Sequence, residues 1–151
     1  MPRRIMRGCA TTAIIGMMVA WGGMVRARQQ VPATPVFSVQ QANAGKAGYA
    51  KNCASCHMPD LSGNSEIPAL AGTSFKATWG PRTTKELYDY MSAAMPYGAP
   101  SLSADTYSEV LAYILQVNGA VAGDATLSAT TAVPIGSVTA ARVPTPAETA
   151  R

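Results

Sequence analysis

The stretch Cys53-Ala54-Ser55-Cys56-His57 limits what the protein can be more than any other part of the chain. Its pattern, C-x-x-C-H, is the attachment motif of a covalently bound c-type haem. Two thiols at this spacing form thioethers with the vinyl groups of the haem, and the histidine that follows is the proximal iron ligand. C-x-x-C alone also occurs in thioredoxin-like sites and in halves of zinc sites. Because His57 adjoins it, we predict thioethers at Cys53 and Cys56 and iron ligation by His57.

The first 27 residues have the composition of an export signal. Basic residues at positions 3, 4 and 7 precede an apolar run over residues 9–25, and Val25-Arg26-Ala27 places small residues at a cleavage site. We predict cleavage after Ala27 and a periplasmic protein. An apolar run of 17 residues is at the lower limit for spanning a bilayer, so an uncleaved anchor facing the periplasm is the alternative.

The net charge of +4 comes from this N-terminal segment. Four of the 12 basic residues and no acidic residue precede residue 28, so the rest of the chain is neutral. We therefore expect no nucleic-acid partner. Cys9 lies in the signal, which leaves Cys53 and Cys56. A small disulfide between them is the alternative to thioethers in an exported protein.

Local signals predict three helices. Ser38, with Gln41 three residues later, predicts a capping box and a helix from Val39 to Asn52 or Cys53. Gly45 and Gly48 within it cost roughly 1 kcal/mol each relative to alanine. They indicate either close approach by another helix or simply a weak helix.

The second helix begins with Thr83 and Glu86, another capping box. It ends at Met95-Pro96, because a residue before proline is disfavoured in helical geometry. Its predicted buried face consists of Leu87, Tyr90, Met91 and Ala94.

The third helix runs from the N-cap Ser103 to a C-terminal stop at Asn118-Gly119. Its apolar stripe consists of Tyr107, Val110, Leu111, Ile114 and Leu115.

Residues 58–82 show little periodicity, and so long an irregular loop is unusual in a compact domain unless it encloses something. We predict that it wraps the haem with Leu61, Ile67, Leu70, Phe75 and Trp79 pointing inward. The Pro68 carbonyl is predicted to accept a hydrogen bond from the second ring nitrogen of His57. Trp79 is predicted to contact a haem propionate, with ordinary core packing as the alternative.

Composition divides the rest of the chain. We expect an extended leader at 28–36, one domain at 37–120, and a mobile tail at 121–151 that has no aromatic residue and cannot build its own core. Within the tail, residues 122–127 are expected to lie along the domain.

The sixth iron ligand must be a methionine, or the position is open, because the chain has one histidine. Met58 adjoins His57, and Met91 lies within a helix. Met95, 38 residues after His57, lies at a helix end and is our prediction. A thioether ligand raises the reduction potential.

The sequence resembles the class I cytochrome c family between Ser38 and Gly119. The resemblance rests on the N-terminal helix, Cys53–His57, Asp60-Leu61-Ser62-Gly63, Pro68-Ala69-Leu70-Ala71-Gly72, Trp79, Met95-Pro96 and Ser101-Leu102-Ser103 through the last helix. It implies an all-α, cytochrome c-like fold with three main helices around a covalent haem. It also implies that Gly45 and Tyr49 cross the C-terminal helix near Tyr113. Met58 departs from the family, where a small residue is common.

These features predict a periplasmic electron carrier or electron-transfer subunit with one haem c. We expect no catalysis and no small-molecule substrate. Its partners would be a redox donor and acceptor, such as a periplasmic dehydrogenase (the resemblance includes cytochromes that serve quinone-cofactor dehydrogenases) and a terminal oxidase. The alternatives are a gas-binding or catalytic haem protein with an open sixth position, and a haem-free thiol redox protein, for which the βαβ pattern is lacking.

Overall fold

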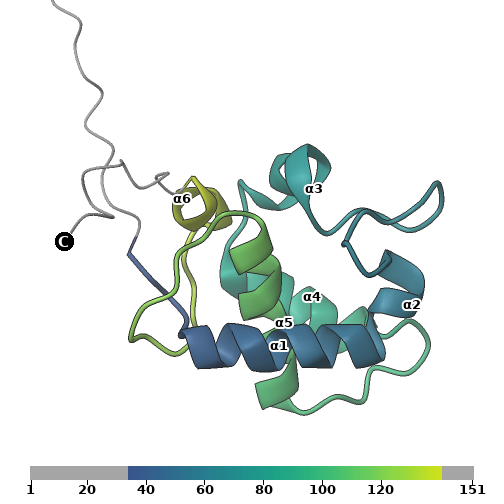
Figure 1. The fold of residues 1–151 in the computed structure, drawn as a ribbon, viewed down its shortest axis with the longest axis horizontal. Helices are drawn as coiled ribbons and strands as arrows, with labels where there is room; N and C mark the ends of the chain where they lie inside the picture. The colour runs from purple at the N-terminus through teal and green to yellow at the C-terminus, as the bar shows by residue number, and fades with distance from the viewer. Residues whose placement is uncertain (1–33, 141–151) are drawn as a thin grey trace, which may run out of the picture.

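The computed structural model describes residues 34–140, and its regular elements there are all α-helices (Figure 1). They are α1 (Val39–Asn52), α2 (Ala54–His57), α3 (Gly72–Trp79), α4 (Thr84–Ala94), α5 (Ala104–Val117) and α6 (Ile135–Thr139). The predicted all-α class is confirmed. The predicted export signal, most of the leader and residues 141–151 lie outside the described residues. No helix within residues 34–140 is long and apolar enough to cross a bilayer.

Helix α1 has the predicted bounds, but its capping box is only half formed. The Ser38 hydroxyl accepts a hydrogen bond from the Gln41 backbone N–H at 3.1 Å, as expected for an N-cap. The Gln41 side chain does not return to Ser38. It donates to the Leu127 carbonyl at 2.6 Å and accepts from the Leu127 N–H at 2.9 Å. A distant partner therefore replaces the local one.

Helices α1 and α5 cross at the centre of the domain (Figure 1). A Cβ atom on Gly45 would overlap the carbonyl oxygen of Glu109, and one on Gly48 would lie 3.1 Å from Cγ2 of Val110. The rings of Tyr49 and Tyr113 pack beside the crossing, 5.5 Å apart. The close helix approach predicted from the glycines is confirmed, and it offsets their cost in helix propensity.

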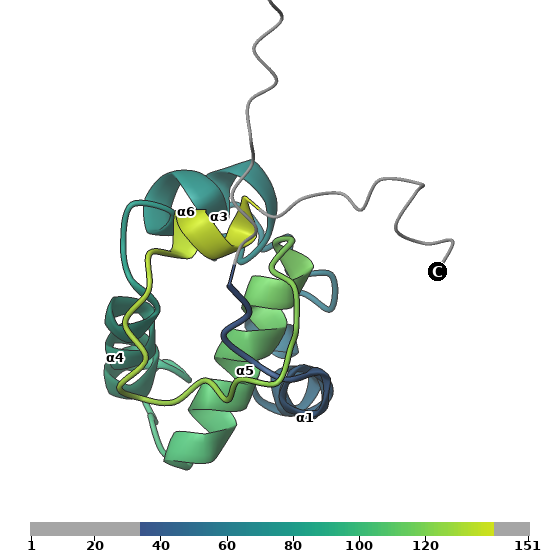
Figure 2. The same cartoon turned by 90° about the vertical axis from the view of Figure 1, so that its left-hand side faces the viewer.

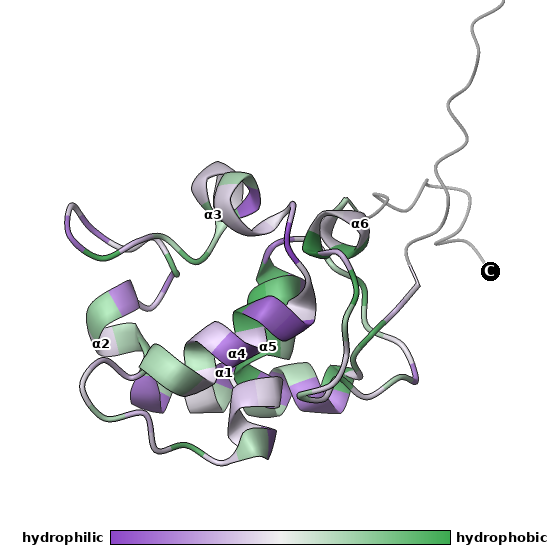
Figure 3. Ribbon diagram, turned by 180° about the vertical axis from the view of Figure 1, so that it is seen from behind, coloured by the Kyte–Doolittle hydropathy of each residue, from purple (hydrophilic) through white to green (hydrophobic). Residues whose placement is uncertain are grey.

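Helix α5 supplies most of the core. All five residues of its predicted stripe are at most 4% exposed, and Figure 3 shows strong hydrophobic colouring along it. The helix begins after Ser103, whose hydroxyl accepts the Thr106 N–H, and ends at Asn118, followed by Gly119 with φ +101°. Both predicted ends are confirmed.

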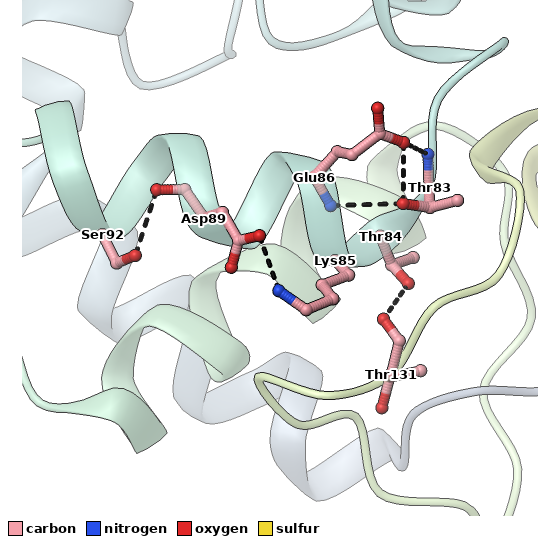
Figure 4. A network of polar contacts seen from close by, with 7 residues as sticks. All are labelled: Thr83, Thr84, Lys85, Glu86, Asp89, Ser92 and Thr131. Atoms are coloured by element: carbon pink, nitrogen blue, oxygen red, sulfur yellow. Dashed lines mark hydrogen bonds and ion pairs between the residues drawn. The ribbon is translucent and has the colours of Figure 1, made fainter.

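Helix α4 begins with the full capping box that the sequence predicted (Figure 4). The Thr83 hydroxyl accepts the Glu86 N–H at 3.2 Å, and the Glu86 carboxylate accepts both the Thr83 N–H and its hydroxyl at 2.8 Å. These hydrogen bonds hold the pKa of the Glu86 carboxyl below its ordinary value. The helix stops at Met95, as predicted.

The buried face of α4 differs from the prediction at Tyr90, which is exposed, and at Ala94, which is only half-buried. Leu87 and Met91 are buried, but Tyr90 is 49% exposed and Tyr88 is buried instead. Tyr88 packs edge-on against Tyr107 of α5, with ring centroids 6.2 Å apart. Helical spacing placed Tyr90 on the apolar face, but the contact with α5 is made by the neighbouring part of the helix surface.

Helix α3 lies inside the stretch that we predicted to be irregular. Leu61 and Phe75 are buried as predicted, whereas the other three predicted inward residues are only half-buried. The start of α3 is tied to the end of α5 through Asn118, which accepts the Gly72 N–H at 3.0 Å and donates to the Leu70 carbonyl at 2.9 Å. With one fully buried residue, α3 has no apolar stripe to reveal it.

Residues 120–140 form a segment that we call the strap. It leaves the end of α5, runs beside α1, and returns along α4 to α6, which lies next to α3 (Figure 2). Leu127, Ile135 and Val138 of the strap are buried in the core. The packed chain therefore extends to residue 140, beyond the boundary at residue 120 that composition suggests.

The start of α4 holds the strap through Thr84, which is fully buried (Figure 4). Its hydroxyl donates to the Thr131 carbonyl at 2.6 Å and accepts the Val133 N–H at 3.2 Å. The Thr84 N–H also donates to the Val133 carbonyl at 2.9 Å. A segment that cannot build a core of its own is thus fastened to an existing one.

The variant Gly45→Ala tests the helix crossing. Because its Cβ overlaps backbone that cannot move independently, we expect the free energy of unfolding to fall by about 3 kcal/mol. Gly48→Ala is the matched control, since it meets only side-chain methyl groups of Val110 and Thr106 and gains about 1 kcal/mol of helix propensity. Denaturant unfolding of the two variants measures the difference, and equal stabilities would contradict the assignment of the contact point.

The variant Thr84→Val tests the attachment of the strap. Removal of the buried hydroxyl leaves the Thr131 carbonyl without its donor, so we expect a loss of about 1–2 kcal/mol in unfolding free energy. Thr78→Val on the exposed face of α3 is the control and should change stability by less than about 0.5 kcal/mol. A strap that contributes nothing to stability would leave both variants alike.

Candidate functional site

The Cys53–His57 motif lies where α1 gives way to α2. Cys53 is the C-cap of α1, and its N–H donates to the Tyr49 carbonyl at 2.9 Å. The His57 N–H donates to the Cys53 carbonyl at 2.9 Å, which closes one helical turn between them. Cys53 and Cys56 are thus separated by about one helical turn, and His57 follows Cys56 directly.

Both motif cysteines are free thiols, so the alternative disulfide is absent from the structure. Cys53 is half-buried and Cys56 is exposed. Burial, followed by the neighbouring Cys56, raises the pKa of the Cys53 thiol to about 11. Reactive redox cysteines have the opposite property, a lowered pKa that favours the thiolate. Cys53 therefore lacks the lowered pKa of a reactive redox thiol.

The His57 ring is held in one orientation by the loop that follows it. The ring is buried, and its Nδ1 lies 2.9 Å from the carbonyl oxygen of Pro68, which can only accept a hydrogen bond. Nδ1 is therefore the donor in this contact, and in the neutral ring Nε2 presents its lone pair. Nε2 has no hydrogen-bond partner among residues 34–140, and it is not completely buried. The structure contains the Pro68 contact that we predicted.

Short-range hydrogen bonds place the Pro68 carbonyl beside Nδ1 of the ring. The Gly63 N–H donates to the His57 carbonyl at 3.1 Å, and the Leu70 N–H donates to the Leu61 carbonyl at 2.9 Å. Between them, the Asn64 side chain accepts the Ile67 N–H at 2.9 Å. The loop is thereby closed on itself on both sides of Pro68. A hydrogen bond like that from His57 Nδ1 to the Pro68 carbonyl fixes the tautomer of a metal-binding histidine and increases its basicity.

The two candidate methionines of α4 occupy different environments. Met91 is buried in the core, among the residues that pack between the helices. Met95 is half-buried and lies at the C-cap, where the backbone turns extended, with φ −126° and ψ 144°. Met95 is thus the methionine that has left the helix. Its ligation of iron stays a prediction.

Trp79, at the end of α3, forms a small aromatic and cationic group. Its ring centroid lies 5.5 Å from that of Tyr90 and 5.0 Å from the Arg82 guanidinium carbon. No hydrogen bond to a described residue occupies its indole N–H. Its contact with a haem propionate stays a prediction. Arg82 and Tyr90 were not predicted here, because Tyr90 was assigned to the core by its helical spacing.

Two tyrosine hydroxyls near the site also escaped sequence analysis. Tyr49 donates to the Met58 carbonyl at 2.7 Å, next to His57, and Tyr107 donates to the Met95 carbonyl at 2.6 Å. Burial raises the pKa of the Tyr49 hydroxyl well above its ordinary value, which keeps it a donor. Both lie on apolar helix faces, so their spacing signals only packing.

The residues at the site fit a covalently attached haem. Cys53 and Cys56 are unpaired thiols one turn apart, and the adjoining His57 has its Nδ1 engaged and its Nε2 available. Such a donor set supplies two thioethers and a nitrogen ligand to iron. Within residues 34–140, no group of three or more His, Cys, Asp or Glu side chains offers an alternative metal site.

A comparison with protein families supports this assignment. The model of a family described as cytochrome c oxidase, cbb3-type, subunit III matches residues 40–114, which include Cys53–His57, Met95 and most of α5. The chain is similar to one in a crystal structure of the sulfane dehydrogenase SoxCD from Paracoccus pantotrophus, with 27% sequence identity and a TM-score of 0.48. That similarity covers 91% of this chain and 68% of the other. A search of curated proteins found no match.

The double variant Cys53→Ser/Cys56→Ser tests covalent attachment. Without thiols no thioether can form, so we expect the haem to be extracted completely by acid acetone, whereas it stays with the wild-type protein. Ser55→Ala, between the two cysteines, is the control and should retain its haem. Haem that survives extraction in the double variant would contradict attachment at this motif.

Proposed function

The chain belongs to the cytochrome c family, and we propose that it is a periplasmic electron-transfer protein in which His57 and Met95 are the axial ligands of one haem c. The covalently bound haem c and the cytochrome c-like fold follow from the family, as the sequence predicted. When bound, the haem supplies a one-electron Fe(II)/Fe(III) couple. The residues of this chain set the environment of that couple.

The observation that carries the proposal is the hydrogen bond from His57 Nδ1 to the Pro68 carbonyl at 2.9 Å. It leaves Nε2 as the available donor beside two free thiols. A carbonyl partner fixes the tautomer and the orientation of the imidazole, as a proximal ligand requires.

The position of Met95 supports ligation by a thioether on the other side of the iron. Met95 follows the last residue of α4 and lies outside the core, whereas Met91 is part of the core. With histidine and methionine ligands the iron has no open position, which suits electron transfer and leaves no site for a substrate. We therefore propose that the chain is not an enzyme by itself.

The surface next to Met95 supports transient docking of redox proteins. Residues 96–100 carry no charge, and Tyr97 is 93% exposed. The neutral balance after residue 27 gives little long-range steering, so a small apolar contact is the expected mode of association with a donor and an acceptor. A dehydrogenase and a terminal oxidase are the classes of partner that we propose. The expected export signal at residues 1–27 supports the periplasmic location.

The variant Met95→Ala tests the ligation. We expect the far-red sulfur-to-iron absorption band of the ferric protein to disappear, the reduction potential to fall, and the ferrous protein to bind carbon monoxide. Met91→Leu is the matched control, because it replaces a buried methionine of the same helix with a residue of similar volume and should retain the band.

Two outcomes would contradict the proposal. A band that persists in Met95→Ala and disappears in Met91→Leu would assign ligation to Met91. Rapid and complete binding of carbon monoxide by the wild-type ferrous protein at neutral pH would show an open sixth position and favour the gas-binding alternative.

A further inference from the structure

Tyr107 connects α5 to the loop that carries Met95. Its side chain is 4% exposed, and its hydroxyl donates to the Met95 carbonyl at 2.6 Å. We propose that Tyr107 is a positioning residue that holds the Met95-Pro96 step against α5 and so opposes departure of the Met95 thioether from the iron. This inference rests on the proposed ligation by Met95.

The loop after α4 has few other attachments. The Met95 N–H donates to the Met91 carbonyl at 2.9 Å, and the Ala99 N–H donates to the Pro96 carbonyl at 3.0 Å. Both bonds are local, and Pro96 has no N–H to donate. Within residues 34–140, the Tyr107 hydroxyl makes the only side-chain hydrogen bond to residues 95–102. It is therefore the polar link between this loop and the core.

The donor itself is held firmly. Tyr107 lies in the first turn of α5, directly after the Ser103 N-cap, and its ring packs edge-on against Tyr88 at 6.2 Å. Further along, α5 contacts α1 at Glu109, where the two backbones meet with no side chain between them. Because Tyr107 is held more firmly than the loop, its hydroxyl restrains the Met95 carbonyl, and not the reverse.

The size of the effect follows from the strength of a buried hydrogen bond. Displacement of Met95 by an added ligand requires the loop to move, which breaks the bond to Tyr107 in the wild-type protein. In Tyr107→Phe that bond is already absent. We therefore expect an added ligand to bind roughly five- to tenfold more tightly to this variant.

Imidazole titration of the ferric holoprotein tests the proposal. The loss of the far-red band at fixed pH reports displacement of the thioether, and denaturant unfolding reports global stability in parallel. For Tyr107→Phe we expect the increase in imidazole affinity given above and a faster displacement.

Two variants serve as controls. Tyr88→Phe removes a neighbouring hydroxyl that makes no hydrogen bond to a described residue. Thr84→Val removes an equivalent buried hydrogen bond that holds the strap, to the Thr131 carbonyl at 2.6 Å. It should lower stability about as much as Tyr107→Phe. Both controls should bind imidazole within twofold of the wild-type protein.

The outcomes separate the two proposals. A wild-type protein without the far-red band would overturn the ligation by Met95, and the role of Tyr107 with it. A band in the wild-type protein with unchanged imidazole affinity in Tyr107→Phe would overturn the role of Tyr107 alone. An equal rise in affinity in Thr84→Val would do the same, because it would show a general loosening of the domain.

A measurement on the wild-type protein covers the case in which Tyr107→Phe does not fold. In proton NMR of the ferrous form, the Tyr107 hydroxyl proton should exchange slowly with water and show a cross-peak to the Met95 or Pro96 α-proton. The exposed Tyr97 hydroxyl is the internal reference for fast exchange. Exchange of the Tyr107 hydroxyl as fast as that of Tyr97 would overturn the proposal.

Discussion

The backbone contact between α1 and α5 at Gly45 and Glu109 is the constraint on which the rest of the structure depends. Because no side chain separates the helices there, their crossing point cannot shift without a clash. The end of α1 continues directly into Cys53, and the first turn of α5 carries Tyr107. The two segments that we expect to bind the iron are far apart in the sequence, but the same rigid helix pair positions both of them.

Three side chains transmit this rigidity to irregular loops, and each does so by donating to a backbone carbonyl. His57 donates to Pro68, Tyr49 to Met58 and Tyr107 to Met95. An irregular segment lacks the regular donors of a helix, so its half-buried carbonyls need partners from elsewhere. The same bonds that satisfy these carbonyls also determine where the loops lie. The hydrogen bonds that pair these loop carbonyls are therefore also the ones that position the site.

Sequence patterns predicted interactions between residues close in the chain and missed those between distant residues. Thr83 and Ser103 marked helix starts correctly, because a cap bonds to an N–H only three residues away. The second half of the Ser38 box was wrong because Gln41 bonds to Leu127, 86 residues later. Residues 122–127 lie along the domain as predicted, but the packing of the strap after Leu127 was missed for the same reason, since isolated apolar residues such as Ile135 and Val138 produce no periodic pattern. Similarly, the Cys53–His57 motif identified the residues that would hold the haem, but no local sequence pattern predicted the hydrogen bonds of the Tyr49 and Tyr107 hydroxyls.

The way in which the ligand segments are held also bears on the kind of haem chemistry that the protein supports. A gas-binding protein needs a sixth position that is vacant or a ligand that leaves readily, whereas an electron carrier benefits from ligands whose geometry is the same before and after transfer. His57 is oriented by Pro68, and the Met95 carbonyl is bonded to a buried hydroxyl on α5. Each tie raises the cost of moving a ligand away from its place. With the proposed ligation by Met95, this arrangement suits an electron carrier better than a protein with an open sixth position.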